Sequence, residues 1–288
     1  VAVLGTGASA VQIVPYLGDY AKHVYVIQRT PSSVDARDNR DTDPDWVKSL
    51  EPDWHQEMMV NFQHALWNGL DRDEPDLICD IWTEINRNLS AELAAAGNEV
   101  TMEEFMAKRE EMDFRVMERL RARCDELVND PATAEALKPY YYHMCKRPLS
   151  SDSYYPTFNR PNVTLLDVSD TQGLQEMTEK GFIANGVEYE IDCMIFASGF
   201  EVTSDLERRW SISAFEGRDG LSIYDHWREG PSTLHGITTH GFPNMAFIGY
   251  IQGGINSSVT EHFGRQGAHA GDHELRAVLV AGAVLQMP

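Results

Sequence analysis

Residues 1–10, VAVLGTGASA, place a short apolar run directly before a glycine-rich turn. Val1 to Leu4 has the composition of a buried parallel strand. Gly5, Gly7 and Ala10 follow in the pattern glycine-x-glycine-x-x-alanine. In dinucleotide-binding units the first glycine makes a tight turn, the second lets the backbone approach a pyrophosphate, and the small third residue lets the next helix pack on the strand. The order of strand, turn and amphipathic stretch therefore predicts a Rossmann-type dinucleotide-binding unit, with a glycine turn that holds no ligand as the alternative.

The second predicted strand, from His23 to Gln28, indicates which dinucleotide is bound. NAD-binding units carry an acidic residue about 20 residues past the glycines, where it binds the ribose hydroxyls. This sequence has Gln28, Arg29 and Thr30 there instead. An acid would repel a 2′-phosphate, whereas a guanidinium pairs with one, so the segment favours NADPH. A solvated arginine at a strand end is the alternative interpretation.

The composition limits the classes of protein and of partner. The chain has 288 residues and a formal net charge of −21. That length is enough for a sizeable core, in one large domain or two. The negative charge argues against nucleic acid or an anionic membrane as the main partner. No apolar run approaches the roughly 20 residues that span a bilayer, and no secretory signal precedes Val1, so we expect a cytoplasmic protein.

The cysteines and histidines give no metal-binding or disulfide pattern. Cys79, Cys124, Cys145 and Cys193 are widely spaced and form neither a C-x-x-C pair nor a zinc-ligand spacing. The ten histidines include no H-E-x-x-H motif. We therefore predict reduced, unpaired thiols and no metal site.

A long helical tract, from about residue 45 to about residue 138, separates the second strand from the next one. Thr101 and Glu104 have the spacing of a capping box, and apolar residues then recur every three or four positions through Leu127. A plain Rossmann unit returns to a strand much sooner, so we interpret the tract as an insertion. Its methionine and aromatic stripes are interpreted as packing surfaces.

Strand patterns return after the insertion. Residues 162–167, NVTLLD, form one candidate strand. A hairpin follows with Asn185 and Gly186 at its turn, a pair that two-residue hairpin turns prefer. Another buried strand is predicted from Cys193 to Ala197. The strands on both sides of the insertion therefore predict one α/β domain that the insertion interrupts.

Five stretches of the sequence resemble the Baeyer–Villiger monooxygenases among the class B flavoprotein monooxygenases, and they follow the family's order. They are GTGASA (5–10), QRTP (28–31), CKRPLSSDSYYPTFNRPNVTLLD (145–167), DCMIFASGFE (192–201) and GPSTLHGITTHGFPNMAFIGY (230–250). The similarity runs from Val1 to about Ala268. The resemblance implies an α/β fold with two dinucleotide-binding domains. The expected parts are a Rossmann-type NADPH-binding domain at 1–197, with the helical insertion at about 45–138, and the C-terminal part of an FAD-binding domain at 198–288.

The resemblance also implies a reaction. Family members use NADPH and FAD to insert one oxygen atom from O₂ beside a ketone carbonyl, which gives an ester or lactone, so the expected partners are a ketone and O₂. They carry an FAD-binding unit before the segment that matches Val1, and 288 residues is about half a family length. We therefore expect a fragment that lacks this N-terminal unit, with a tail after Ala268 that departs from the family pattern.

The resemblance assigns cofactor-binding residues position by position. Those in the glycine loop and the following helix are Gly5, Thr6, Gly7, Ala8, Ser9 and Gln12. The residues expected at the 2′-phosphate are Arg29, Thr30 and Lys146. The return to the FAD-binding domain is expected at Ala197, Ser198 and Gly199, where Ser198 replaces a threonine that is commoner in the family. Residues 242–250 would form a strand near the flavin, followed by a helix through about Ala268.

Arg147 is the residue that the resemblance makes catalytic. Oxygen insertion develops negative charge on oxygen, and a fixed cation stabilises that charge. Arginine suits this role because it stays protonated and offers several donors. Without the resemblance, Lys146, Arg147 and Pro148 would be interpreted as a basic pair on the surface.

Other classes of protein match parts of the pattern. Tyr142 and Lys146 have the Y-x-x-x-K spacing of short-chain dehydrogenases, but Pro148 and the lack of a helical pattern after Lys146 argue against the helix that this pair needs. A flavoprotein disulfide reductase requires a redox cysteine pair, which the sequence lacks. A nitrogen- or sulfur-oxygenating class B monooxygenase and a non-catalytic NADP-binding module stay open.

Overall fold

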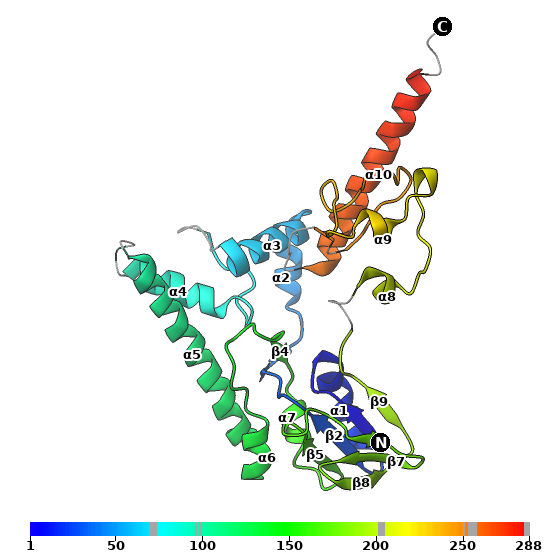
Figure 1. Cartoon of the computed structure of the whole chain (residues 1–288). Coiled ribbons are helices and arrows are strands. Elements are labelled where there is room, and N and C mark those ends of the chain that lie inside the picture. The colour runs from blue at the N-terminus through cyan, green and yellow to red at the C-terminus, as the bar shows by residue number, and fades with distance from the viewer. Residues whose placement is uncertain are drawn as a thin grey trace. The chain divides into compact units, whose positions relative to one another are not determined.

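The first two predicted strands lie side by side in the middle of a parallel sheet. In the computed structural model this sheet has the order β5-β2-β1-β9. It is formed by β1 (Ala2–Leu4), β2 (Val24–Gln28), β5 (Val163–Asp167) and β9 (Met194–Phe196) (Figure 1). Ala2 pairs with Tyr25 on one side and with Met194 on the other. The chain moves outward from β1 to β5 and then returns to the far side of β1, so the strand order reverses between β1 and β9.

The structure describes residues 1–68, 74–95, 97, 100–200, 205–249, 251–252 and 258–284. The chain divides into two compact units. The first unit comprises Val1–Pro52 and Gly69–Phe200, and the second comprises Asp53–Asn68 and Glu201–Pro288. The parallel sheet belongs to the first unit.

The parallel sheet is packed on both faces. One face contacts α1 (Ala8–Tyr20), α7 (Tyr154–Thr157) and the C-terminal part of α5 (Met102–Leu127), with a core that includes Val3, Val11, Val14, Val26 and Cys124. The other face contacts a small antiparallel sheet through Ala2, Ile27, Leu166 and Phe182. Val26 and Ile27 thus enter opposite layers, because successive side chains of a strand point to opposite faces.

The small antiparallel sheet contains the predicted hairpin. Its strands β6, β7 and β8 pair in that order and span Glu176–Met177, Gly181–Ala184 and Val187–Glu190. Asn185 and Gly186 form the turn with φ of 51° and 74°, the left-handed conformation that such a turn needs at both positions. Phe182 stacks on Tyr189 with ring centroids 5.2 Å apart and meets Tyr25 of β2 edge-on, so the hairpin is packed directly against the parallel sheet.

A short parallel pair joins two segments that are distant in the sequence. β3 (Val34–Asp35) pairs with β4 (Leu149–Ser150), and Val34 is opposite Leu149. The Leu149 N–H also donates to the Ser33 carbonyl at 3.1 Å. The pairing therefore places the residues just before β4 next to the segment that follows β2.

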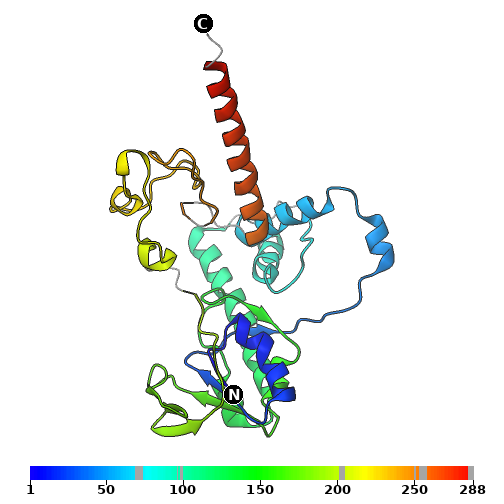
Figure 2. The ribbon, with the colours of Figure 1, turned by 90° about the vertical axis from the view of Figure 1, so that its right-hand side faces the viewer.

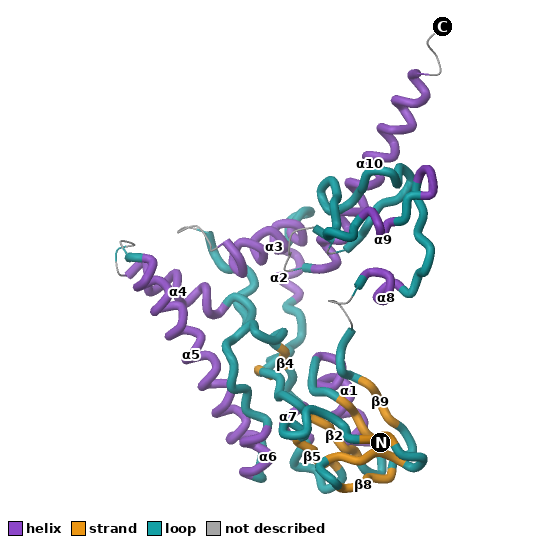
Figure 3. Tube along the Cα trace, in the orientation of Figure 1, coloured by secondary structure: helices purple, strands orange, loops and turns teal. Residues whose placement is uncertain are grey.

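The helical insertion lies between β2 and β5. In the first unit it contains α2 (Pro44–Ser49), α4 (Glu84–Ala95), α5 and α6 (Pro131–Ala136). The predicted capping box is present at the start of α5, where the Thr101 hydroxyl accepts from the Glu104 N–H and the Glu104 carboxylate accepts from the Thr101 N–H. α5 is one long helix (Figure 2) and packs against α4 through Ile85, Leu89, Met112, Val116 and Leu120. The start of α5 lies away from the strands, whereas α6 lies near them (Figure 3).

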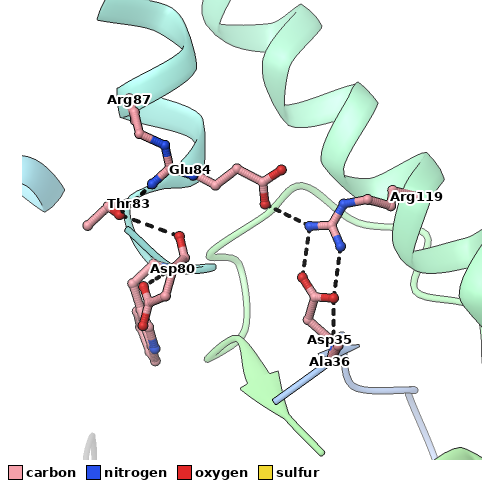
Figure 4. A network of polar contacts seen from close by, with 8 residues as sticks. Asp35, Ala36, Asp80, Thr83, Glu84, Arg87 and Arg119 are labelled. Carbon is pink, nitrogen blue, oxygen red and sulfur yellow. Dashed lines mark hydrogen bonds and ion pairs between the residues drawn. The ribbon is translucent and has the colours of Figure 1, made fainter. Parts of the chain in front are cut away.

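A charged network fastens this insertion to the β3–β4 pair (Figure 4). The Arg119 guanidinium donates to both carboxylate oxygens of Asp35 at 2.8 Å and to Glu84 at 2.7 Å. The Asp35 side chain is 6% exposed and the Arg119 side chain is 45% exposed. Hydrogen bonding to Asp35 raises the pKa of Arg119. Because Asp35 is in β3, Glu84 begins α4 and Arg119 is in α5, one guanidinium joins three elements.

The second unit is built around aromatic side chains. Its elements are α3 (Trp54–Gln63), the π-helical turn η1 (His64–Asn68), α8 (Leu206–Trp210), the 3-10 turn η2 (Arg218–Gly220), α9 (Ile223–His226) and α10 (Val259–Val284). Ile223, Trp227, Phe242 and Phe247 form its buried core. Trp210 stacks on Phe247 with ring centroids 5.9 Å apart, which connects α8 to this core.

The strand expected at residues 242–250 is wrong. Residues 242–249 run through turns and irregular backbone, and Tyr250 lies outside the described residues. A strand needs a hydrogen-bonded neighbour, and the described residues of the second unit form only isolated β-bridges. The Phe247 side chain enters the aromatic core instead. The helix expected through about Ala268 is present as part of α10.

The described residues carry neither a paired cysteine nor a group of metal ligands. All four cysteines are free thiols, of which Cys124 is buried and the others are exposed. Within the described ranges, no three His, Cys, Asp or Glu side chains are placed to hold a metal ion together. No helix in these ranges has both the length and the apolar composition that crossing a membrane requires.

Replacing Arg119 by methionine should destabilise the first unit, because the buried Asp35 carboxylate would lose both guanidinium donors. We expect a loss of about 2–3 kcal/mol in the free energy of unfolding, measured by urea denaturation with circular dichroism. The control is Arg115→Met on the same helix. Its pairs with Glu92 and Glu111 are largely exposed, so we expect a much smaller loss. Equal losses in the two variants would contradict the role given to the network.

Candidate nucleotide-binding cleft

A cleft opens in the first unit at the carboxyl ends of β1 and β9, where the strand order reverses. Its volume is about 540 Å³, and open α/β sheets bind ligands at this position. Every predicted site residue other than Gln12 lines it, namely Gly5, Thr6, Gly7, Ala8, Ser9, Arg29, Thr30, Lys146, Arg147, Ala197, Ser198 and Gly199. Gln12 lies one turn further along α1, where its side-chain amide donates to the Ala8 carbonyl at 2.9 Å.

Gly5 and Gly7 have different roles in the glycine loop. Gly5 has a φ of +110°, and a Cβ there would lie 2.5 Å from the Ala197 carbonyl oxygen. Its N–H donates to the Ile27 carbonyl at 2.9 Å. Gly7 has a φ of −76°, and a Cβ there would meet nothing within 4 Å. Gly5 therefore lets the ends of β1 and β9 meet, whereas Gly7 leaves open space in front of α1.

The N-terminus of α1 borders the cleft and is suited to an anion. Gly7 is the N-cap and offers no side chain, and the first turn contains no acidic residue. The Val11 N–H donates to the Gly7 carbonyl at 3.0 Å, so the amides of residues 8–10 precede the first intrahelical bond. Such amides, together with the helix dipole, favour negative charge.

Lys146 is held at the cleft by neutral groups. Its ammonium donates to the Thr30 carbonyl at 3.4 Å, and the Thr6 hydroxyl donates to the same carbonyl at 2.9 Å. The ammonium also lies 5.8 Å from the ring centroid of Tyr141. The Tyr141 hydroxyl is hydrogen-bonded to the backbone of residues 31–33. These contacts orient Lys146 without neutralising its charge.

Positive charge is concentrated beside the glycine loop. Burial, and next the charge of Arg29, lower the pKa of Lys146 from its ordinary value. In the described part of the chain, neither side chain forms an ion pair with a carboxylate. Two cations close enough to repel each other, without an acidic partner, are an arrangement that a bound anion would stabilise.

Arg147 is exposed and lines the cleft beside Lys146. Its guanidinium lies 5.2 Å from the ring centroid of Trp82. It forms no ion pair with any carboxylate of the described residues. Its charge and its N–H donors therefore stay available to a ligand in the cleft.

Gln28 stands where NAD-binding units carry an acid, but its side chain is directed to α6. It is fully buried, and its Nε2 donates to the Ala136 carbonyl at 2.7 Å. Arg29 and Thr30 line the cleft, and Gln28 does not. The side chains that can meet a ligand at the end of β2 are therefore those of Arg29 and Thr30.

Sequence reasoning missed part of the cleft wall. Val168, Gln172, Gly173 and Leu174 reach the cleft from the loop that follows β5. The signal for them was available, because the strand at NVTLLD was predicted and the carboxyl ends of parallel strands meet at one edge of a sheet. Trp82, which contacts Arg147 but does not line the cleft, was also missed, because it lies in the insertion whose aromatic residues are interpreted as packing.

The fold and the cleft define an α/β protein of the dinucleotide-binding class. No family model matches the chain. Its curated relatives include neopentalenolactone D synthase from Streptomyces avermitilis, which is 44% identical over 284 residues, and Baeyer-Villiger monooxygenase ATR8 from Stachybotrys chlorohalonatus, which is 47% identical over 253 residues. The first match covers 98% of this chain and 47% of the relative, and the second covers 88% and 40%.

Solved structures are similar to this chain as well. A polycyclic ketone monooxygenase from Thermothelomyces thermophila superposes with a TM-score of 0.75 at 32% identity, covering 91% of this chain and 43% of that one. An OTEMO complex with FAD and NADP gives a TM-score of 0.67 at 26% identity, covering 98% and 53%. The chain is a relative of the Baeyer–Villiger monooxygenases, which confirms the resemblance and the expected fold. It spans about half the length of the curated relatives it matches.

Alanine substitution should separate the roles of the two glycines. Gly5→Ala should lower the free energy of unfolding by about 2–4 kcal/mol, because alanine is strained at a positive φ and because its Cβ would clash with the Ala197 carbonyl. Gly7→Ala should cost about 1 kcal/mol or less, because its backbone is unstrained and its surroundings are open. Hydrogen exchange of the β1 and β2 amides measures both values. A Gly7→Ala loss as large as that of Gly5→Ala would contradict this division of roles.

Proposed function

We propose that the chain is part of an NADPH- and FAD-dependent monooxygenase of the Baeyer–Villiger type. In this proposal residues 1–197 form the NADPH-binding domain and residues 198–288 the C-terminal part of the FAD-binding domain. The observation that carries the proposal is the cleft itself, which unites the glycine loop, three basic side chains and the segment after β9. The relatives named Baeyer–Villiger monooxygenase or ketone monooxygenase support it.

The cleft residues fit NADPH. The open space at Gly7 and the amides at the start of α1 would hold the pyrophosphate. Arg29 and Lys146, whose charges lack an acidic partner among the described residues, would hold the 2′-phosphate. Thr30 would contribute to the same end of the cleft, because its carbonyl fixes the Lys146 ammonium.

The residues for FAD in this chain are the return segment Ala197, Ser198 and Gly199, which lines the cleft after β9. Gly199 has a φ of +98°, and a Cβ there would meet nothing within 4 Å, so its backbone is open to a ligand. When bound, NADPH supplies a hydride and FAD activates O₂. The chain's own residues would bind and orient the two cofactors.

Arg147 would act on the substrate, which we propose is a ketone. Its guanidinium stays protonated and offers planar donors. During oxygen insertion beside the carbonyl group, negative charge develops on the carbonyl oxygen, and a fixed cation in the cleft stabilises it. Lys146 is assigned to the nucleotide phosphate, so Arg147 is the cation left for this charge.

We also propose a cytoplasmic location, with small molecules as the main partners. The formal net charge of −21 supports this assignment because it disfavours nucleic acid and anionic membrane surfaces. A ketone carries no charge, so its binding does not suffer from this surface charge.

The affinity for NADP should fall at alkaline pH more steeply than the affinity for NAD. The pKa of Lys146 is lowered by burial and by Arg29, and a bound 2′-phosphate favours the ammonium form. Affinity is therefore full below that pKa and is lost as the pH rises through it. Calorimetric titrations from about pH 7 to about pH 10 measure the slope. Lys146→Met should bind more weakly and without this slope. Arg29→Ala should bind more weakly and keep the slope, displaced to higher pH because the charge of Arg29 no longer lowers the pKa of Lys146. If the pH dependence survives in Lys146→Met, Lys146 is not the group that binds the 2′-phosphate.

Arg147→Ala tests the reaction in a complete enzyme that contains this segment. Ester formation from a ketone should fall about 10²–10³-fold, while flavin reduction by NADPH is largely retained because the glycine loop, Arg29 and Lys146 place the nucleotide. Anaerobic stopped-flow spectroscopy measures reduction, and product analysis measures oxygenation. Arg147→Lys should recover little, because an ammonium lacks the planar fork. If reduction collapses while the reduced enzyme oxygenates ketone normally, Arg147 is a nucleotide-binding residue.

A further inference from the structure

The guanidinium of Arg147 has an aromatic neighbour from the helical insertion. It lies 5.2 Å from the ring centroid of Trp82. Trp82 stands two positions before the first residue of α4. The Arg147 side chain is exposed and makes no ion pair within the described residues. Its long stem is flexible, so an exposed arginine without a fixed partner samples many rotamers. The contact with Trp82 supplies that partner.

The turn that carries Trp82 is fixed by its own hydrogen bonds. The Asp80 carboxylate accepts from the Trp82 N–H at 2.9 Å, and the Asp80 backbone carbonyl accepts from Glu84 at 3.0 Å. Arg87 donates to Asp76 at 2.8 Å, and Asp76 also accepts from the backbone N–H groups of residues 78 and 79. The turn before α4 is thus held at both of its ends, and Figure 4 shows the end at Asp80 and Thr83.

The same frame holds the strand beside Arg147. Glu84 of α4 is joined through Arg119 to Asp35 of β3, and β3 pairs with β4, which begins two residues after Arg147. The indole and the guanidinium are therefore attached to one hydrogen-bonded structure. This structure fixes the positions of the two backbone segments, and the contact with the indole then holds the flexible Arg147 side chain.

We propose that Trp82 is a positioning residue that orients the Arg147 guanidinium toward the cleft. An aromatic face attracts the cation. Unlike a carboxylate, it neither cancels the charge nor occupies the in-plane N–H donors. Lys146 is held over Tyr141 in a similar way. The proposal rests on the function proposed above for Arg147.

The test compares Trp82→Leu and Trp82→Phe in a complete enzyme that contains this segment. Trp82→Leu should lower the fraction of NADPH consumption that yields oxygenated ketone about tenfold, with flavin reduction changed less than about twofold. Trp82→Phe should recover most of that fraction, because it keeps an aromatic face. In the Arg147→Ala background, Trp82→Leu should have no further effect.

The matched control is Tyr140→Leu, because the Tyr140 ring lies 5.2 Å from Arg121 outside the cleft. It should leave both measurements unchanged.

A second readout does not depend on activity. In the 288-residue chain, a double-mutant cycle of Trp82→Leu and Arg147→Ala should show coupled shifts in Tm. Additive shifts would overturn the proposal. An equal loss of reduction and oxygenation in Trp82→Leu, or normal oxygenation in that variant, would also overturn it. If the cycle is coupled but the wild-type enzyme oxygenates no ketone, the contact stands and the proposed function fails instead.

Discussion

The close approach of Gly5 to the end of β9 is the constraint on which the site depends. Only a residue without a Cβ allows the backbone at position 5 to lie against the Ala197 carbonyl. That contact brings together the carboxyl ends of β1 and β9, where the strand order reverses. The start of α1 then follows within a few residues, with its amides at the same edge. A larger residue at position 5 would separate the loop from the return segment, and the cleft would lose one wall.

The parts of the fold that depend on local chemistry could be predicted from the sequence. The turn at Asn185 and Gly186 and the capping box at Thr101 are each decided by a few adjacent residues, and both are present. The strand expected at residues 242–250 depended on partners far along the chain, and the described residues do not supply them. Local pattern is therefore informative about turns and caps, and much less informative about strands that must find a neighbour.

The site residues also divide into those that local spacing predicts and those that depend on distant parts of the chain. Arg29 and Thr30 could be placed by their spacing from the glycines, because β1 and β2 are adjacent. Lys146 and Arg147 could be placed only through the family resemblance, because their position depends on the pairing of β3 with β4 across the whole insertion. Trp82 gave no signal in the sequence, since a stripe of aromatic residues on helices is usually a packing surface. Trp82 meets Arg147 across the insertion, which Arg119 joins to β3.

The buried side chain of Gln28 limits how the coenzyme preference of this scaffold could be redesigned. The usual strategy places an acid at the end of the second strand, but here that side chain is turned into the core and serves as a tether to α6. A glutamate at this position would bring a charge into the core without reaching a ribose, so it would destabilise the scaffold rather than change its choice of coenzyme. Redesign would have to begin at the next two positions, whose side chains share the cleft with the ligand.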